Sequence, residues 1–224
     1  MDALIQPHCR KSLTLKDRLF LQTIHGRSIP EQTLDEWLDH ERTLHVLLDS
    51  PEIFDISSSL YFYVLSRQLL MKRDIDDRDL ADYMASLLCQ GMFSRYFLDF
   101  SGGSLHFYSF DVLDRIERAT NAYEHFSLGV QLGNISLLLT GLFPDFLEQR
   151  AERNGAPRCS YYENIGRAQF YAAGEHPLAK RHGLSQIFAN LAENFDATKE
   201  TITYISKNVC FLGEDFWAYQ KFLS

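Results

Sequence analysis

The sequence predicts an all-α protein that folds as a single domain around a buried central helix. Apolar residues recur at helical spacing along most of the 224 residues, and strand-like alternation is confined to residues 104–110. The stretch SLGVQLGNISLLLTGLFP, at residues 127–144, is apolar over most of its length. Such a run is typical of a helix that is buried on nearly all sides. We therefore expect a multi-helix bundle over residues 1–224, with its central helix at about residues 127–143.

Composition and charge favour a soluble, cytoplasmic protein. Hydrophobic residues make up 46% and charged residues 23% of the chain, as in ordinary globular proteins. The net charge of −8 disfavours binding to nucleic acids and to anionic membrane surfaces. Four scattered cysteines without metal-like spacing indicate reduced thiols, and the first twenty residues lack the pattern of a secretory signal. The longest apolar stretch contains Gln131, Asn134 and several glycines, which makes it too polar to span a bilayer.

The first fifty residues contain signals for two helices. Gly26 and Pro30 predict a loop after a weakly amphipathic segment. Thr33 and Glu36 form a capping-box pattern, which predicts the start of a helix that continues to Leu48.

Two further helices are expected before residue 92. Ser50 and Pro51 form a start signal, and a strongly apolar helix is expected over residues 56–71. Asp79 is the expected N-cap of the next helix, which Gly91 would terminate.

An aromatic segment, MFSRYFLDFSGGSLHFYSF, follows and contains the clearest break in the chain, at Gly102 and Gly103. Its alternation predicts a small extended or hairpin element near residues 100–110. We expect an amphipathic helix over residues 110–126, with Tyr123 among its inward residues, leading directly into the central helix. Pro144 should kink or stop that helix.

The last third predicts four helices and a tail. A charged helix should end at Gly155, and Ser160 with Glu163 forms a second capping-box pattern. Helices are also expected over residues 178–195 and 197–208. In the helix after Ser160, the expected core-facing residues are Tyr161, Ile165, Ala168 and Ala172. The tail at 209–224 is expected to dock on the domain or on a partner subunit through four aromatic residues, Phe216, Trp217, Tyr219 and Phe222.

The central helix carries two stripes of small or polar residues on opposite sides. Small residues at three- and four-residue spacing favour close helix packing, and access for a flat ligand is the alternative. They are Gly129, Gly133, Ser136 and Thr140. On the other side, Gln131 and Asn134 must find polar partners, either across helices or in a polar pocket.

Arg67 lies in the middle of an apolar helix face and needs a carboxylate if it is buried. Glu124 or Glu163 could supply one. The alternative is that Arg67 extends along the surface and keeps its charge in water.

No motif in the sequence specifies a reaction. It has no nucleophile elbow, phosphate loop or dinucleotide fingerprint, and its histidines and carboxylates lack the spacing of a metal site. We therefore expect no metal and no cofactor. The residues expected to form a ligand site or a buried polar network are Arg67, Gln131, Asn134, Tyr162, Glu163 and Arg167.

Three blocks of sequence resemble a group of uncharacterised bacterial all-helical cytoplasmic proteins. They are YFYVLSRQLL at 61–70, DRDLADYMASLL at 77–88, and the segment at 132–170 that begins LGNISLLLTGLFPDF. This resemblance implies a bacterial, cytoplasmic helical protein and no particular activity.

Two hypotheses of function follow. The first is a protein-interaction or regulatory module without catalytic activity, which binds another protein or assembles with itself. The second is a helical enzyme or small-ligand-binding protein with a polar pocket beside the central helix.

Overall fold

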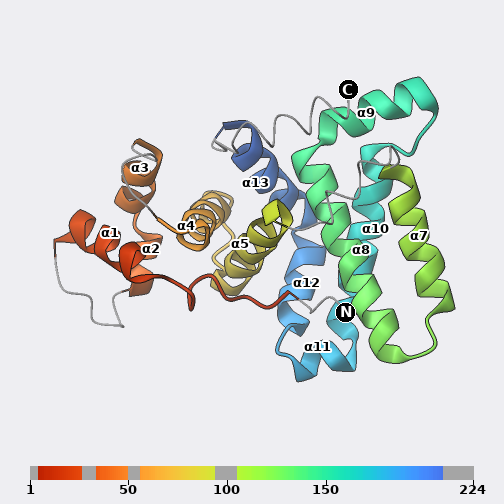
Figure 1. Ribbon diagram of the computed structural model, residues 1–224, viewed down its shortest axis with the longest axis horizontal. Coiled ribbons are helices and arrows are strands. Elements are labelled where there is room, and N and C mark those ends of the chain that lie inside the picture. The colour runs from red at the N-terminus through yellow and green to blue at the C-terminus, as the bar shows by residue number, and fades with distance from the viewer. Residues whose placement is uncertain (1–4, 27–33, 50–55, 94–104, 209–224) are drawn as a thin grey trace. The chain divides into compact units, whose positions relative to one another are not determined.

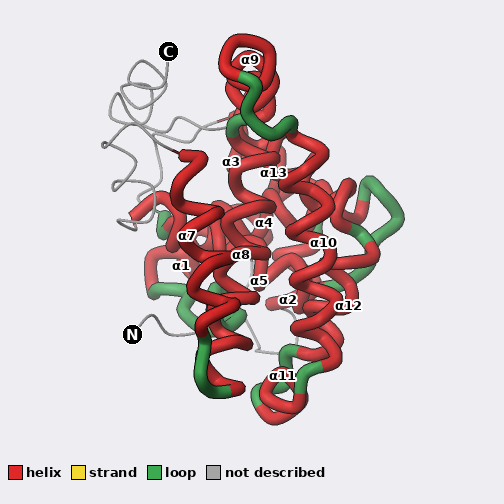
Figure 2. The backbone as a smooth tube through the Cα atoms, turned by 90° about the vertical axis from the view of Figure 1, so that its right-hand side faces the viewer, coloured by secondary structure: helices red, strands yellow, loops and turns green. Residues whose placement is uncertain are grey.

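The computed structural model describes residues 5–26, 34–49, 56–93 and 105–208. Within these ranges the chain forms twelve helices and no strand, which confirms the all-α prediction (Figures 1 and 2). The chain divides into two compact units, Ile5–Gln90 and Gly91–Ser224. The single domain over residues 1–224 stays a prediction.

The first unit contains the helices α1 to α4 and most of α5. Their bounds are Leu15–His25 for α1, Leu34–Asp39 for α2, Glu41–Asp49 for α3, Ser58–Met71 for α4 and Arg78–Phe93 for α5. Helix α4 packs against α2 and α3, and α1 packs against both of these as well. The core of this unit is apolar and includes Phe20, Leu38, Leu44, Leu60 and Leu69.

Local signals fix the ends of α1. Thr14 is its N-cap and forms a reciprocal capping box with Asp17, so two backbone amides at the helix start are bonded. Gly26 ends the helix at φ +71°, a left-handed conformation that glycine adopts without a steric penalty. The break expected at Gly26 is therefore confirmed.

Three boundary predictions for these helices are wrong. Gly91 does not end α5, which continues to Phe93. The helix expected to continue to Leu48 is interrupted at His40, which separates α2 from α3. The amides of Asp79 and Leu80 both donate to Asp77 Oδ1 at 2.9 Å, so Asp77 rather than Asp79 caps α5. The expected signals at Thr33, Ser50 and Pro51 lie outside the described residues.

The second unit contains seven helices among its described residues. Their bounds are Leu105–Arg118 for α7, Ala122–Leu142 for α8, Pro144–Asn154 for α9, Cys159–Glu175 for α10, Pro177–Arg181 for α11, Ser185–Glu193 for α12 and Phe195–Asn208 for α13. Helix α8 packs against α7, α10 and α13. Figures 1 and 2 show α8 running alongside α10.

Helix α8 is the buried central helix that the sequence predicts. Fourteen of its residues are buried, among them a continuous run from Leu132 to Gly141. Pro144 begins α9, and the two helices meet at an angle of 92°. The stop expected at Pro144 is confirmed, and so is the end of α9 at Gly155, where φ is +64°.

No single helix among the described residues has both the length and the apolar character needed to cross a membrane. Only the bent pair of α8 and α9 reaches that length and composition together.

The extended or hairpin element expected near residues 100–110 is wrong from Leu105 onward, because these residues begin α7. Aromatic alternation over so short a run cannot distinguish a strand from the first turns of a helix.

The prediction of an uninterrupted helix over residues 110–126 is also wrong. Helix α7 ends at Arg118, and α8 starts anew after Asn121, whose side chain accepts from the amide of Glu124 at 2.8 Å. Tyr123 is 47% exposed rather than inward.

The buried face of helix α10 differs from the one that the sequence predicts. Its buried residues are Tyr162, Gly166, Phe170, Ala173 and Gly174, whereas Ala168 and Ala172 are exposed. The capping box expected at Ser160 is absent, because α10 starts at Cys159. The amide of Cys159 instead donates to Glu148 Oε1 at 3.0 Å, so a carboxylate from α9 satisfies the start of α10.

Candidate functional site

The small residues of α8 and α10 let these helices approach closely. A Cβ atom at Gly133 would lie 2.9 Å from the ring of Phe170, and one at Gly166 would lie 2.6 Å from the ring of Phe195. Gly141 faces Ile202 of α13, where a Cβ atom would lie at 2.7 Å. Side chains from the neighbouring helices therefore fill the small-residue stripe of α8, as expected for a packing surface.

Glu163 lies at the edge of this packing and is bonded to α13. Its Oε1 accepts from Lys199 Nζ at 2.7 Å, and the two side chains are each about one-fifth exposed. The thiol of Cys159 donates to the same oxygen at 3.5 Å. Burial and the neighbouring Glu163 carboxylate raise the pKa of Cys159 to about 12, so this cysteine remains a thiol at neutral pH.

Arg167 connects α10 to the end of α12 and the start of α13. Its guanidinium donates to Asp196 at 3.0 Å and to the carbonyl of Ala192 at 3.2 Å, and it lies 5.5 Å above the centre of the Phe195 ring. Arg167 is half-buried, and each of these contacts is with the protein itself. The arrangement is that of a structural bridge between helices.

The remaining polar candidates of this unit lie on the same two packed helices. Gln131 is half-buried and Asn134 is buried in α8, while Tyr162 of α10 packs with Ile135 and Leu139. Gln131, Asn134 and Tyr162 each interact with other groups of the structure. The structure thus brings five of the six predicted residues onto adjoining helices, and the sixth, Arg67, belongs to the other unit.

Arg67 is 98% buried in the first unit and binds two aspartates. Its Nε and Nη2 donate to Asp39 at 2.9 and 3.2 Å, and Nη2 also donates to Asp76. These partners replace Glu124 and Glu163, which the sequence suggested, and the buried side chain excludes the alternative in which Arg67 extends into water.

Asp39 is the centre of this charge cluster. Arg78 donates to its Oδ2 at 2.7 and 3.0 Å, and the side chain of Gln68 donates to its backbone carbonyl at 2.5 Å. Burial alone would raise the pKa of Asp39, but the hydrogen bonds from Arg67 and Arg78 hold it below its ordinary value. The carboxylate is therefore ionised at neutral pH and joins α2, α4 and α5.

A second carboxylate, the fully buried Asp17, joins α1 to α4 and was not recognised from the sequence. Its side chain is fully buried and accepts from the amide and hydroxyl of Thr14 at 2.7 and 2.8 Å. It also accepts from the amide and hydroxyl of Ser57, the N-cap of α4, each at 2.7 Å. The capping-box spacing of Thr14 and Asp17 was the signal that could have found it.

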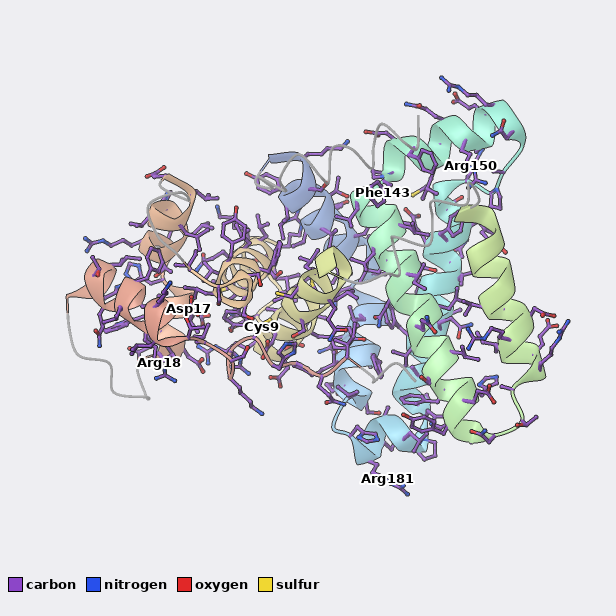
Figure 3. All side chains as sticks on the ribbon, viewed as in Figure 1. Cys9, Asp17, Arg18, Phe143, Arg150 and Arg181 are labelled. Carbon is purple, nitrogen blue, oxygen red and sulfur yellow. The ribbon has the colours of Figure 1, made fainter. Side chains whose placement is uncertain are left out.

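The opposite side of α1 carries exposed leucines. Leu15 is 73% and Leu19 is 51% exposed, and their four-residue spacing places them on one helical face. Lys11, Lys16 and Arg18 lie beside them in the sequence and are at least partly exposed. We call Leu15, Lys16, Arg18 and Leu19, together with Lys11 in the turn that precedes the helix, the outer face of α1. Figure 3 labels Asp17 and Arg18 on this helix.

Other predicted features are not placed by the structure. The aromatic residues Phe216, Trp217, Tyr219 and Phe222 lie outside the described residues. Among the residues that are described, no three side chains of His, Cys, Asp or Glu are grouped so that they could hold a metal ion.

Comparisons with protein-family models, curated proteins and solved structures found no match to this chain. The resemblance to uncharacterised bacterial helical proteins therefore stays a prediction.

Proposed function

We propose that this protein is a non-catalytic interaction module that binds another protein through the outer face of α1. The observation that carries this proposal is the exposure of Leu15 and Leu19 on a helix that a buried carboxylate holds in place. Exposing two neighbouring leucines costs solubility, and paired exposed apolar residues are typical of contact surfaces. Because Asp17 fixes α1 against α4, this face is ordered before any partner arrives, which reduces the entropy lost on binding.

The charges around the leucines indicate the chemistry of the partner. Lys11, Lys16 and Arg18 form a basic border in a protein whose net charge is −8. A complementary partner presents an amphipathic segment, with apolar residues that cover Leu15 and Leu19 and acidic residues that meet the border.

The packing around α8 supports this proposal over the alternative of a ligand pocket. The rings of Phe170 and Phe195 and the side chain of Ile202 fill the space beside the α8 glycines and Gly166. Glu163 and Arg167 bind Lys199 and Asp196. These side chains join helices to one another. Such contacts are expected in the closed core of an interaction protein.

A cytoplasmic compartment is part of the same proposal. The thiols of Cys9, Cys89 and Cys159 are free, as expected in reducing surroundings.

Site-specific photocrosslinking in the native cell tests the proposal. The photoreactive amino acid benzoylphenylalanine is placed at position 15 of the full chain, and at position 171 as a matched control, because Tyr171 is 68% exposed in the other unit. We expect crosslinks from position 15, but not from position 171, to a segment of one other protein that combines apolar and acidic residues. Leu19→Glu should reduce this crosslink by about tenfold or more, because it places a carboxylate in an apolar contact.

Three results would contradict the proposal. They are equal crosslinking from positions 15 and 171, crosslinks from position 15 to lipid, and crosslinks to a second copy of this chain. The last result would show self-assembly in place of a separate partner.

A further inference from the structure

The turn that precedes α1 is bound to α5 by side chains of that helix. The amide of Cys9 donates to Asp82 Oδ1 at 2.7 Å, the amide of Arg10 donates to the same atom at 3.4 Å, and the amide of His8 donates to Ser86 Oγ at 3.2 Å. Figure 3 labels Cys9 where this segment passes the helices of the first unit. The backbone of the turn is thus held over one face of α5.

This contact brings two cysteines together. Cys9 is fully buried, and its sulfur lies 3.4 Å from Ser86 Oγ. Cys89 lies three residues beyond Ser86 on α5, and so on nearly the same helical face. The two thiols are close enough that each shifts the pKa of the other, and Cys89 keeps 8% of its surface exposed. Hydrophobic packing does not explain this arrangement, because it requires neither the pairing nor the surrounding hydroxyl groups.

The two sulfurs differ in their surroundings. Hydrogen bonding with Cys9 and with Ser58 and Ser59, in the first turn of α4, favours the charged form of Cys89. These bonds outweigh burial and lower the pKa of Cys89. The neighbouring Cys89 and burial raise the pKa of Cys9, so Cys89 is the more acidic thiol of the pair and Cys9 is the one that keeps its proton.

We propose that Cys9 and Cys89 form a dithiol site that a hydroperoxide oxidises to an intramolecular disulfide. In the first step the thiolate form of Cys89 attacks the terminal oxygen of the hydroperoxide, the O–O bond breaks, and Cys89 becomes a sulfenic acid. The other oxygen leaves as hydroxide from hydrogen peroxide, or as an alkoxide from an organic hydroperoxide, and takes up a proton. In the second step the Cys9 sulfur attacks the Cys89 sulfur, the S–S bond forms and water leaves. With hydrogen peroxide, two thiols supply two electrons, and one peroxide becomes two waters.

The disulfide would fix the N-terminal turn to α5 covalently. It would close a long loop from residue 9 to residue 89, and cross-links over long loops stabilise folded proteins by restricting the unfolded chain. The oxidised protein should therefore unfold at a higher temperature than the reduced protein, and a reductant should reverse the shift.

The test treats the full chain with hydrogen peroxide and then alkylates the remaining thiols after unfolding. Peptide mass spectrometry should find Cys9 linked to Cys89, while Cys159, whose pKa of about 12 keeps it protonated, is still alkylated. The proposal is overturned if Cys159 is oxidised while Cys9 and Cys89 remain thiols, or if Cys89 pairs with another cysteine.

Two variants test the order of events. In Cys9→Ser the second thiol is missing, so the Cys89 sulfenic acid should accumulate and be trapped by dimedone. Ser58→Ala removes one hydrogen bond to Cys89 but leaves the N-cap Ser57 intact, and it should slow disulfide formation by about threefold or more. Ser160→Ala, beside Cys159, is the matched control and should change nothing. Equal rates for Ser58→Ala and the unchanged protein would contradict Cys89 as the attacking sulfur.

Discussion

The helices within each of the two units of this protein are joined by different kinds of interaction. In the unit Ile5–Gln90, carboxylates join helices: the buried Asp17 binds the start of α4, and the partly buried Asp39 accepts from the buried Arg67 and from Arg78. In the unit from Gly91 onward, helices meet where glycines allow close approach, as at Gly133 and Gly166.

The difference shows how each unit should respond to change. A buried ion pair tolerates little loss of charge, because the partner that remains is left uncompensated in a poorly hydrated site. A glycine contact tolerates little increase in volume, because the facing ring cannot move away without disturbing its own packing. Charge at the Arg67–Asp39 cluster and volume at the glycine contacts are therefore the two variables to change, one in each unit.

The largest effect is expected from Arg67→Met, which keeps an unbranched apolar stem and removes the buried charge. Asp39 would retain Arg78 but lose two hydrogen bonds, and the free energy of unfolding of the first unit should fall by about 3 kcal/mol. This loss is measured by unfolding the protein in urea and monitoring NMR signals that are resolved for each unit.

Lys72→Met removes an exposed positive charge at the end of the same helix and is the matched control, with an expected loss below about 0.5 kcal/mol. Adding Asp39→Asn to Arg67→Met should recover part of the loss, since no buried carboxylate is then left short of partners. Equal losses for Arg67→Met and Lys72→Met would show that the buried cluster does not hold the unit together.

A smaller effect is expected from Gly166→Val in the second unit. The new side chain would overlap the ring of Phe195 and the Cβ atom of Ser136 on α8, and overpacking of this kind costs about 2 kcal/mol. The same measurement on Ala168→Val, on the exposed side of α10, supplies the control. If both variants unfold at the same urea concentration, the close approach of α8 and α10 is not what stabilises this unit.

Acid should weaken the first unit through Asp39, with an effect smaller than either substitution. Because its folded pKa is lowered, Asp39 contributes stability that is present above its unfolded pKa of about 4 and is lost as the pH falls through the folded value. Burial raises the pKa of Asp82, so the effect of Asp82 on stability changes with pH in the opposite direction. The contribution of Asp39 therefore has to be separated from that of Asp82. Comparing Asp39→Asn with the unchanged protein at pH 5 and pH 3 isolates Asp39. An identical pH dependence in both proteins would contradict this role.

The smallest effect on stability is expected at the outer face of α1. Leu15→Glu with Leu19→Glu should change the free energy of unfolding by less than about 0.5 kcal/mol, because both side chains lie largely in water. Thermal unfolding by circular dichroism checks this. A loss above 2 kcal/mol would mean that the leucines stabilise the protein itself and are not kept for a partner.

Local signals in the sequence predicted much of the fold. The all-α class, the buried helix at residues 127–143, and the breaks at Gly26, Pro144 and Gly155 all depend on residues close together in the chain. The stripe containing Gly133 was also interpreted correctly as a packing surface, because small residues at helical spacing have few other uses in a buried helix.

The partners of buried charges could not be predicted in the same way. The need of Arg67 for a carboxylate follows from its apolar surroundings, but the choice of Asp39 and Asp76 depends on how α2 and the turn after α4 are placed. The prediction of which face of α10 is buried was wrong because the adjacent Tyr161 and Tyr162 can each start an apolar stripe. Only the packing with α8 selects the stripe through Gly166.

Hydrogen exchange on the full chain, with Arg67→Met and Gly166→Val measured side by side, tests the central claim most directly. If charge holds one unit and close packing the other, Arg67→Met will accelerate exchange in α4 and leave α8 and α10 protected. Gly166→Val will do the reverse. Uniform acceleration across both units by either substitution would contradict the account.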